Sequence, residues 1–199
     1  MSGRKPQHDQ GPCTIRSVRA DDFEAISEIY APYVRDTPIT FEVDPPSART
    51  MCDRWQSSSA TGAPYLVAER DGQLIGYAGS RPFGEKVGFA WTLENAIYLD
   101  AGYQRRGIGL ALLEALVNEA ATAGFRQMVA LITALETETN KDTASVYLHR
   151  RAGFTVSGRL ANVGFKLGRW HNLIYMQRAL GEGAASSPIP VTRASPTLA

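Results

Sequence analysis

The stretch from Glu94 to Ala120 constrains the fold more than any other part of the sequence, because it reads as a strand, a glycine-bearing turn and a helix. The apolar run 96–99 suits a buried strand. From Leu110 onward, apolar residues recur at spacings of three and four, which predicts an amphipathic helix. The turn QRRGIG, residues 104–109, joins the two. Other elements of the chain can be placed around this unit.

The QRRGIG turn has the chemistry of an anion site. The first amide N–H groups of a helix have no partner inside the helix, and the helix dipole adds positive charge there. Gly107 and Gly109 lack Cβ atoms, which allows a phosphate to approach the main chain. Residues 105–110 therefore predict a diphosphate site, although a tight turn with packing glycines is the alternative reading. Leu112 excludes a dinucleotide fingerprint, and a P-loop is excluded because Gly-Lys-Ser/Thr is absent.

Composition and charge exclude several classes of protein. The chain has 199 residues, of which 44% are hydrophobic and 21% charged, as in one globular domain. Its formal net charge of +1 lacks the basic excess of a nucleic-acid binder. Cys13 and Cys52 form no metal-binding or CxxC spacing, and the sequence shows neither a membrane-spanning run nor a signal peptide. We therefore expect a cytoplasmic protein with no metal, no nucleic-acid partner and no membrane contact.

The two ends of the chain differ from its middle. Residues 1–13 are polar, and residues 181–199 are rich in Ala, Ser and Pro, so we expect both to be disordered around a domain at 14–180. The patterns predict a strand at 14–18, a helix capped by Asp21 or Asp22 and ending near Pro32, a helix at 47–58, and a hairpin at 65–80 that turns at Asp71-Gly72. After the central strand and helix they predict a strand at 127–132, a helix at 143–151, and strands at 154–163 and 170–178. This order predicts an α/β domain with a mixed, mostly antiparallel sheet.

Three separated motifs carry a resemblance to a known family. QRRGIG resembles the Q/R-x-x-G-x-G/A element of the GNAT N-acetyltransferases, and the order of elements is similar to the GNAT fold. WTLENAIYLDAGYQRRGIG, SVYLHRRAGF and GFKLGRWHN together resemble the phosphinothricin, methionine sulfoximine and methionine sulfone acetyltransferase group over residues 14–180. The resemblance implies acetyl-CoA as co-substrate, held between two splayed central strands of a single-domain GNAT fold. It also implies a small amino-acid-like acceptor and a homodimer.

The resemblance implies coenzyme contacts along the central strand and the turn. Backbone groups of the strand would pair with the pantetheine arm as with a short strand, and the turn would hold the diphosphate. The family has an asparagine followed three residues later by serine, whereas Asn140 and Ser145 are five positions apart here. The expected coenzyme contacts are Ile97, Tyr98, Leu99, Gln104, Arg105, Arg106, Gly107, Ile108, Gly109, Asn140 and Ser145.

Acetyl transfer to an amine needs a base and an acid. An amino group with a pKa near ~10 is mostly protonated at neutral pH, so a base must take its proton. Glu94 corresponds to the glutamate of the W-T-x-E motif, which in the resembling group acts through water. His149 stands where many GNAT enzymes have a tyrosine that protonates the leaving sulfur, and where the phosphinothricin group has histidine. A backbone N–H near Tyr98 is expected to stabilise the oxyanion.

The acceptor residues depart from the resemblance. An amino-acid acceptor calls for a cation, and Lys86 and Phe89 stand where the family has arginine and tyrosine. Lysine keeps the charge but lacks the planar fork of arginine. The expected acceptor contacts are Lys86, Val87, Phe89 and Lys166, with Arg169 as a further cation.

Two alternatives remain open. One is a GNAT enzyme for another amine, such as a protein N-terminus, a polyamine or an aminoglycoside; the other is a catalytically silent module that binds coenzyme A. The presence of Glu94 and His149 speaks against the silent module. A polyamine or aminoglycoside favours an acidic cleft, and the basic residues Lys86, Lys166 and Arg169 speak against one.

Overall fold

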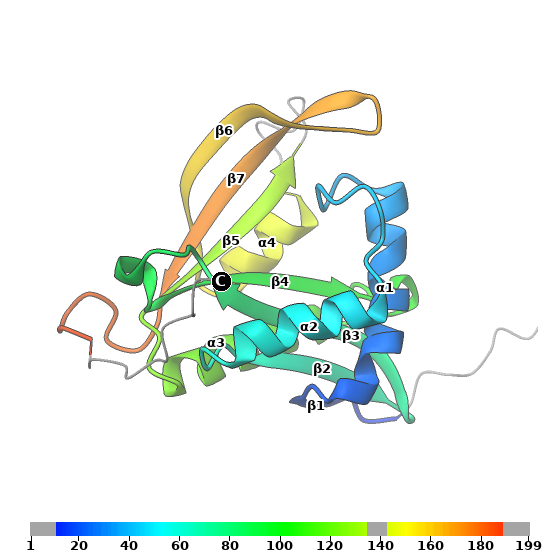
Figure 1. Ribbon diagram of the computed structural model, residues 1–199, viewed down its shortest axis with the longest axis horizontal. Coiled ribbons are helices and arrows are strands. Elements are labelled where there is room, and N and C mark those ends of the chain that lie inside the picture. Colours follow the sequence, from blue (N-terminus) through cyan, green and yellow to red (C-terminus); the bar gives the residue numbers. More distant parts are fainter. Residues whose placement is uncertain (1–10, 135–142, 189–199) are drawn as a thin grey trace, which may run out of the picture.

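The computed structural model describes residues 11–134 and 143–188, which build a seven-stranded sheet in the order β1-β2-β3-β4-β5-β7-β6 (Figure 1). Only β4 and β5 are parallel; every other neighbouring pair is antiparallel. The strands are β1 (Thr14–Ser17), β2 (Tyr65–Arg70), β3 (Gln73–Pro82), β4 (Thr92–Leu99), β5 (Gln127–Ala134), β6 (Thr155–Lys166) and β7 (Arg169–Ala179). The predicted mixed, mostly antiparallel sheet is confirmed.

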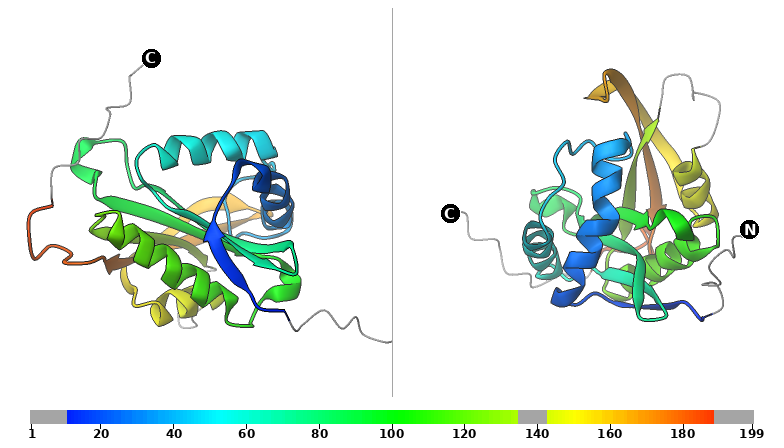
Figure 2. Two further views of the ribbon diagram at one scale, coloured as in Figure 1. Left: turned by 90° about the horizontal axis from the view of Figure 1, so that it is seen from below. Right: turned by 90° about the vertical axis from the view of Figure 1, so that its right-hand side faces the viewer.

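Helices cover both faces of this sheet (Figure 2). α1 (Phe23–Asp36) and α2 (Ala48–Ser59) lie on one face, and α3 (Ile108–Thr122) and α4 (Ala144–Arg151) lie on the other. Among the described residues, three short 3-10 turns connect elements, namely η1 (Ala20–Asp22), η2 (Val87–Phe89) and η3 (Ala101–Tyr103). Because side chains alternate along a strand, β2 sends Val67 to the core under α1 and sends Leu66 to the larger core under α3.

Local signals in the sequence set the turns and helix starts. Asp71 and Gly72 have φ values of 52° and 76°, as the tight turn of the β2–β3 hairpin requires. The hydroxyl of Ser47 accepts a hydrogen bond from the amide of Thr50 at 3.1 Å and so caps α2. Thr143 caps α4 in the same way.

For the first helix the predicted end is wrong, whereas the predicted cap is confirmed in position only. α1 continues past Pro32 to Asp36. A proline inside a helix removes one hydrogen bond, but Val34, two residues beyond Pro32, is fully buried, so the apolar face continues beyond the proline. Asp22 is the N-cap residue of α1, as one of the two predicted positions, but its side chain makes no capping hydrogen bond to the helix. Its carboxylate instead accepts hydrogen bonds from the guanidinium of Arg16 and the amide of Arg19, each at 2.7 Å.

The two central strands separate along their length. β4 pairs with β5 only between residues 92–95 and 127–130. β4 then continues to Leu99 and β5 to Ala134 with no pairing between them. The predicted splayed pair is confirmed, and it leaves a gap beside residues 96–99.

The predicted boundaries of the domain lie near the limits of the described residues. Residues 181–188 form turns, in which the carboxylate of Glu182 pairs with Arg126 at 3.3 Å. Residues 1–10 and 189–199 lie outside the described residues. The disorder of the two ends stays a prediction.

Candidate active site

A cavity of about 720 Å³ lies where β4 and β5 separate. β4 contributes residues 94–98 and β5 contributes residues 130–134. On one side the cavity is lined by Ser145 and His149 of α4, and on the other by residues of α1, α2 and the segment 38–42. Both predicted catalytic residues, Glu94 and His149, therefore face one space.

Glu94 and His149 reach this space from opposite faces of the sheet. Adjacent residues of a strand point to opposite faces, so Glu94 lies on the face of α1 and α2, whereas Asn95 lies on the face of α4 and contacts His149. Tyr98, on the same face as Glu94, packs its ring 4.8 Å from that of Tyr30 in α1. The gap between β4 and β5 is what joins the two sides.

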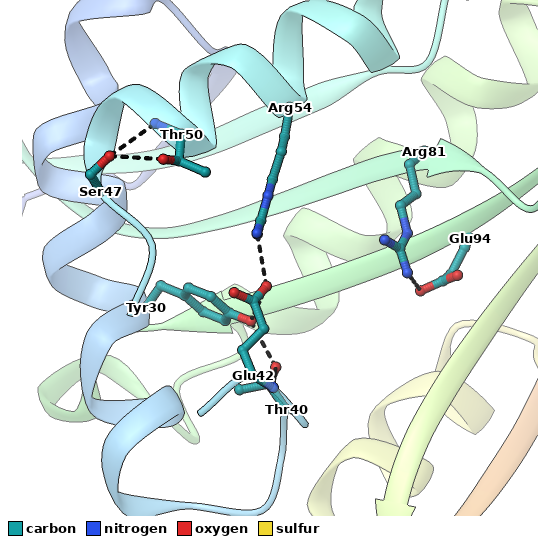
Figure 3. A network of polar contacts seen from close by, with 8 residues as sticks. All are labelled: Tyr30, Thr40, Glu42, Ser47, Thr50, Arg54, Arg81 and Glu94. Atoms are coloured by element: carbon teal, nitrogen blue, oxygen red, sulfur yellow. Dashed lines mark hydrogen bonds and ion pairs between the residues drawn. The ribbon is translucent and has the colours of Figure 1, made fainter. Parts of the chain in front are cut away.

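The carboxylate of Glu94 forms an ion pair with Arg81. The two residues are direct partners in the β3–β4 ladder, and Arg81 Nη2 lies 2.7 Å from Glu94 Oε1 (Figure 3). The Glu94 side chain is 17% exposed and that of Arg81 is 66% exposed. Glu94 is thus held at the wall of the cavity by a cation that also reaches solvent.

His149 is buried, with a relative exposure of 2%. Its Nδ1 lies 2.8 Å from the carbonyl oxygen of Ser145, and its Nε2 lies 3.0 Å from Asn95 Oδ1. Burial lowers the pKa of His149 below its usual range, because the charged ring loses water, while the Ser145 contact acts in the opposite direction. The ring is therefore fixed in position between α4 and β4.

The central strand offers part of the expected coenzyme surface. Ile97 and Tyr98 line the cavity, as does Ser145. Leu99 does not line it, and its carbonyl oxygen accepts a hydrogen bond from Tyr33 Oη at 2.5 Å. Asn140 lies outside the described residues.

The QRRGIG turn is exposed from Gln104 to Gly107, whereas Ile108 and Gly109 are buried at the start of α3. Gly107 is the N-cap residue with φ of 82°, a left-handed conformation that favours glycine. A Cβ atom there would meet nothing within 4 Å, so the main chain is open to an approaching group. Arg105 and Arg106 are exposed beside it. These features fit a diphosphate.

Gly109 has a different reason for being glycine. A Cβ atom there would lie 3.4 Å from Leu99 and 3.6 Å from Leu148, so it is the close packing of α3 on β4 and α4 that leaves little room for a larger side chain. The alternative reading of the turn, with a packing glycine, thus holds for Gly109, while the open approach holds for Gly107.

The residues expected to contact the acceptor lie elsewhere. Lys86, Val87 and Phe89 are exposed in and beside η2, and none of them lines the cavity. Lys166 is 4% exposed, and its Nζ donates a hydrogen bond to the carbonyl oxygen of Thr40 at 2.7 Å. Burial lowers the pKa of Lys166. Arg169 is exposed at the start of β7.

The cations that do line the cavity are Arg54 and Arg81, which the sequence reasoning did not single out. Asn95 was missed as well, although it directly follows Glu94. Alternation along the strand could have assigned Asn95 to the opposite face. The place of Arg81 opposite Glu94 depends on the irregular connection 83–91, for which the sequence has no register signal.

Comparisons with known proteins agree with this geometry. The family profile described as Acetyltransferase (GNAT) family matches residues 23–154. A phosphinothricin N-acetyltransferase of Alcaligenes faecalis is 39% identical over 176 residues, covering 88% of this chain and 87% of the relative. An L-methionine sulfoximine/L-methionine sulfone acetyltransferase of Salmonella typhimurium is 34% identical, covering 86% of this chain and 97% of the relative.

A solved structure shows the same fold. The GNAT superfamily phosphinothricin acetyltransferase of Sinorhizobium meliloti, crystallised in complex with acetyl-CoA, is 38% identical and superposes with a TM-score of 0.82. The alignment covers 89% of this chain and 93% of that one. The chain therefore belongs to the acetyltransferase (GNAT) family.

Proposed function

We propose that the protein transfers the acetyl group of acetyl-CoA to the amino group of a small amino-acid-like acceptor, of the phosphinothricin, methionine sulfoximine or methionine sulfone type. One observation carries the proposal: a single cavity holds Glu94 on one side of the splayed strands and His149 on the other. The similarity to enzymes named for these acceptors supports the choice of acceptor.

The residues divide between the two substrates. Bound acetyl-CoA supplies an activated acetyl thioester. Gly107 and the first amides of α3 hold its diphosphate, and the open edge of Ile97 and Tyr98 holds its pantetheine arm. Gln104, Arg105 and Arg106 lie beside the diphosphate in this assignment.

Proton transfers occur on both sides of the gap. Glu94 takes a proton from the acceptor ammonium, directly or through water, so that the free amine can attack. In its doubly protonated form His149 donates Nδ1–H to the Ser145 carbonyl, and the proton on Nε2, which faces Asn95 Oδ1, is the one given to the sulfur that leaves. The acceptor ammonium thus loses two protons in becoming the amide, the first to Glu94 before attack and the second from the tetrahedral adduct. The thiolate gains one proton from His149, and a net excess of one proton is released to solvent.

The protein is also proposed to act as a cytoplasmic homodimer. The β6–β7 hairpin exposes apolar side chains in a group, which is typical of an interface: Leu160, Val163, Phe165, Leu167 and Trp170. Light scattering after size-exclusion chromatography will measure the mass in solution.

In residues 11–134 and 143–188, no helix has the length and apolarity to cross a bilayer, and no three His, Cys, Asp or Glu side chains gather as metal ligands.

A thiol assay tests the activity. Release of free CoA is measured with 5,5′-dithiobis(nitrobenzoate) across amino acids, their sulfoximine, sulfone and phosphinate analogues, polyamines, aminoglycosides and peptide N-termini. Turnover with the amino-acid analogues is the expected result. Tight acetyl-CoA binding without turnover on any amine would overturn the enzyme assignment, and turnover confined to other amines would overturn the acceptor.

A further inference from the structure

The ion pair of Arg81 and Glu94 lies where the acceptor must present its amine. We infer that this pair is the recognition site for the zwitterionic head of an α-amino acid, with the carboxylate on Arg81 and the ammonium on Glu94. The inference rests on the proposed function and specifies how the acceptor is selected. It assigns the carboxylate to a residue outside the set that the family resemblance implied.

The pair has the geometry for this role. Arg81 and Glu94 are directly opposite on β3 and β4, and Nη2 and Oε1 are 2.7 Å apart (Figure 3). The guanidinium has five N–H donors, and its bond to Glu94 uses Nη2. Since 66% of the Arg81 side chain is exposed, an incoming carboxylate can reach the guanidinium without displacing a buried group.

An α-amino acid matches this spacing. Its ammonium and its carboxylate are attached to the same Cα, through bonds of about 1.46 and 1.52 Å. Opposite charges held next to each other are therefore needed to bind both groups at once. The planar fork of arginine can donate two parallel hydrogen bonds to a carboxylate, and Glu94 is the group that must receive the amine proton. Binding of the carboxylate to Arg81 thus places the amine of the acceptor beside Glu94, the proposed base.

The other charges in the cavity support the assignment. Glu42 and Glu94 are each paired with an arginine, since Arg54 Nη1 lies 2.7 Å from Glu42 Oε1. A cavity in which carboxylates and guanidinium groups balance does not attract a polycation. Arg54 is paired with Glu42, in the segment before α2, and Figure 3 shows this pair apart from Glu94, so Arg81 is the arginine that stands beside the proposed base.

The experiment compares an amino acid with its own α-amide. The pair is L-methionine sulfone and L-methionine sulfone α-amide, which differ only in the carboxylate charge and the amine pKa. kcat/KM is measured for both acceptors with wild type, Arg81→Gln, Arg81→Lys, Arg54→Gln and Lys86→Gln. The readout is how the acid-to-amide ratio changes relative to wild type, so effects common to both acceptors cancel.

The expected result is a ratio that falls about 10- to 100-fold in Arg81→Gln, as for loss of a charged hydrogen bond, with a smaller fall in Arg81→Lys. Arg54→Gln removes the same charge from the same cavity and keeps the wild-type ratio. The inference is overturned if Arg81→Gln lowers both acceptors equally, or if Lys86→Gln is the variant that changes the ratio.

Failure of the proposed function has a different signature. If wild type releases no CoA with any amine, acetyl transfer itself is wrong. If wild type turns over other amines but no α-amino acid, or uses acid and amide without any change in Arg81→Gln, acetyl transfer stands and the recognition site is wrong. Thermal unfolding of each variant confirms that the exposed substitutions leave the fold intact.

Discussion

The Nε2 atom of His149 lies 3.0 Å from Asn95 Oδ1, and this contact ties helix α4 to strand β4 one residue after Glu94. The other ring nitrogen faces the carbonyl oxygen of Ser145 at 2.8 Å. Both nitrogens thus face oxygen atoms, an arrangement that a doubly protonated ring satisfies, whereas burial favours the neutral ring. Asn95 is therefore a positioning residue whose chemistry sets the proton state of His149.

Replacement of Asn95 is expected to change the pH dependence of catalysis. Asn95→Asp places a carboxylate beside the imidazole and should raise the pKa of His149, so the His149-dependent limb of kcat moves to higher pH by about 1 unit. Asn95→Leu removes the partner and should lower kcat about 10-fold. Profiles of kcat against pH, with the acetyl-CoA Kd as control, will measure this. Identical profiles in all three proteins would contradict the role of Asn95.

Glu94→Gln keeps the size of the side chain and removes the base. We expect kcat to fall ~10²-fold or more, with the Kd for acetyl-CoA unchanged, since the proposed coenzyme contacts are on other parts of β4 and on α3. Steady-state kinetics and calorimetry of acetyl-CoA binding separate the two effects. Turnover at the wild-type rate would remove Glu94 from the mechanism.

The elements that depend on local chemistry were predictable from the sequence. The Asp71-Gly72 turn is predicted from residue type alone. The helices predicted to begin at 47 and 143 are capped there by Ser47 and Thr143. The separation of β4 and β5 is predicted only because the order of elements resembles the GNAT fold. The turn and the caps depend only on neighbouring residues, whereas the splay depends on contacts between distant parts of the chain.

Features that depend on long-range packing were not predictable. Lys166 donates a hydrogen bond to the carbonyl oxygen of Thr40, 126 residues away in the chain. It is therefore buried and not exposed in the hairpin as a contact for the acceptor. Arg81 and Glu94 are partners in the β3–β4 register. The irregular connection 83–91 between the two strands gives no sequence signal for that register. The helix continues past Pro32 because burial of Val34 counters the lost hydrogen bond.

The QRRGIG turn can be tested with a matched pair of glycines at the two ends of α3. Gly107 and Gly124 have φ values of 82° and 87°, and a Cβ atom would meet nothing within 4 Å at either position. Alanine in a left-handed conformation costs roughly 1–2 kcal/mol, so both alanine variants should lose similar thermal stability. Only Gly107→Ala should raise the KM for acetyl-CoA, because only that methyl group lies at the proposed diphosphate site. Equal KM values in the two variants would return the turn to a structural role.

The buried imidazole of His149 predicts a loss of stability in mild acid. In the unfolded chain its pKa is about 6.5, and in the folded protein burial lowers it. The unfolded state therefore binds a proton first as the pH falls, which makes unfolding more favourable below about pH 6.5 until the folded pKa is reached. Well above pH 6.5 the contribution of His149 to the free energy of unfolding does not change with pH.

The predicted loss of stability in mild acid is tested by comparing wild type with His149→Gln. The Tm of wild type should fall between pH 8 and pH 5 more steeply than that of His149→Gln, which cannot titrate at this position. Every other titrating group is common to both proteins, including Asp22, whose pKa is lowered by Arg16 and which acts at more acidic pH. The difference in slope therefore isolates His149. A parallel pH dependence in both proteins would mean that the pKa of His149 is the same in the folded and unfolded states. A ring already protonated in the folded state, with both nitrogens donating to Ser145 and Asn95, would instead make the Tm of wild type fall less steeply than that of His149→Gln.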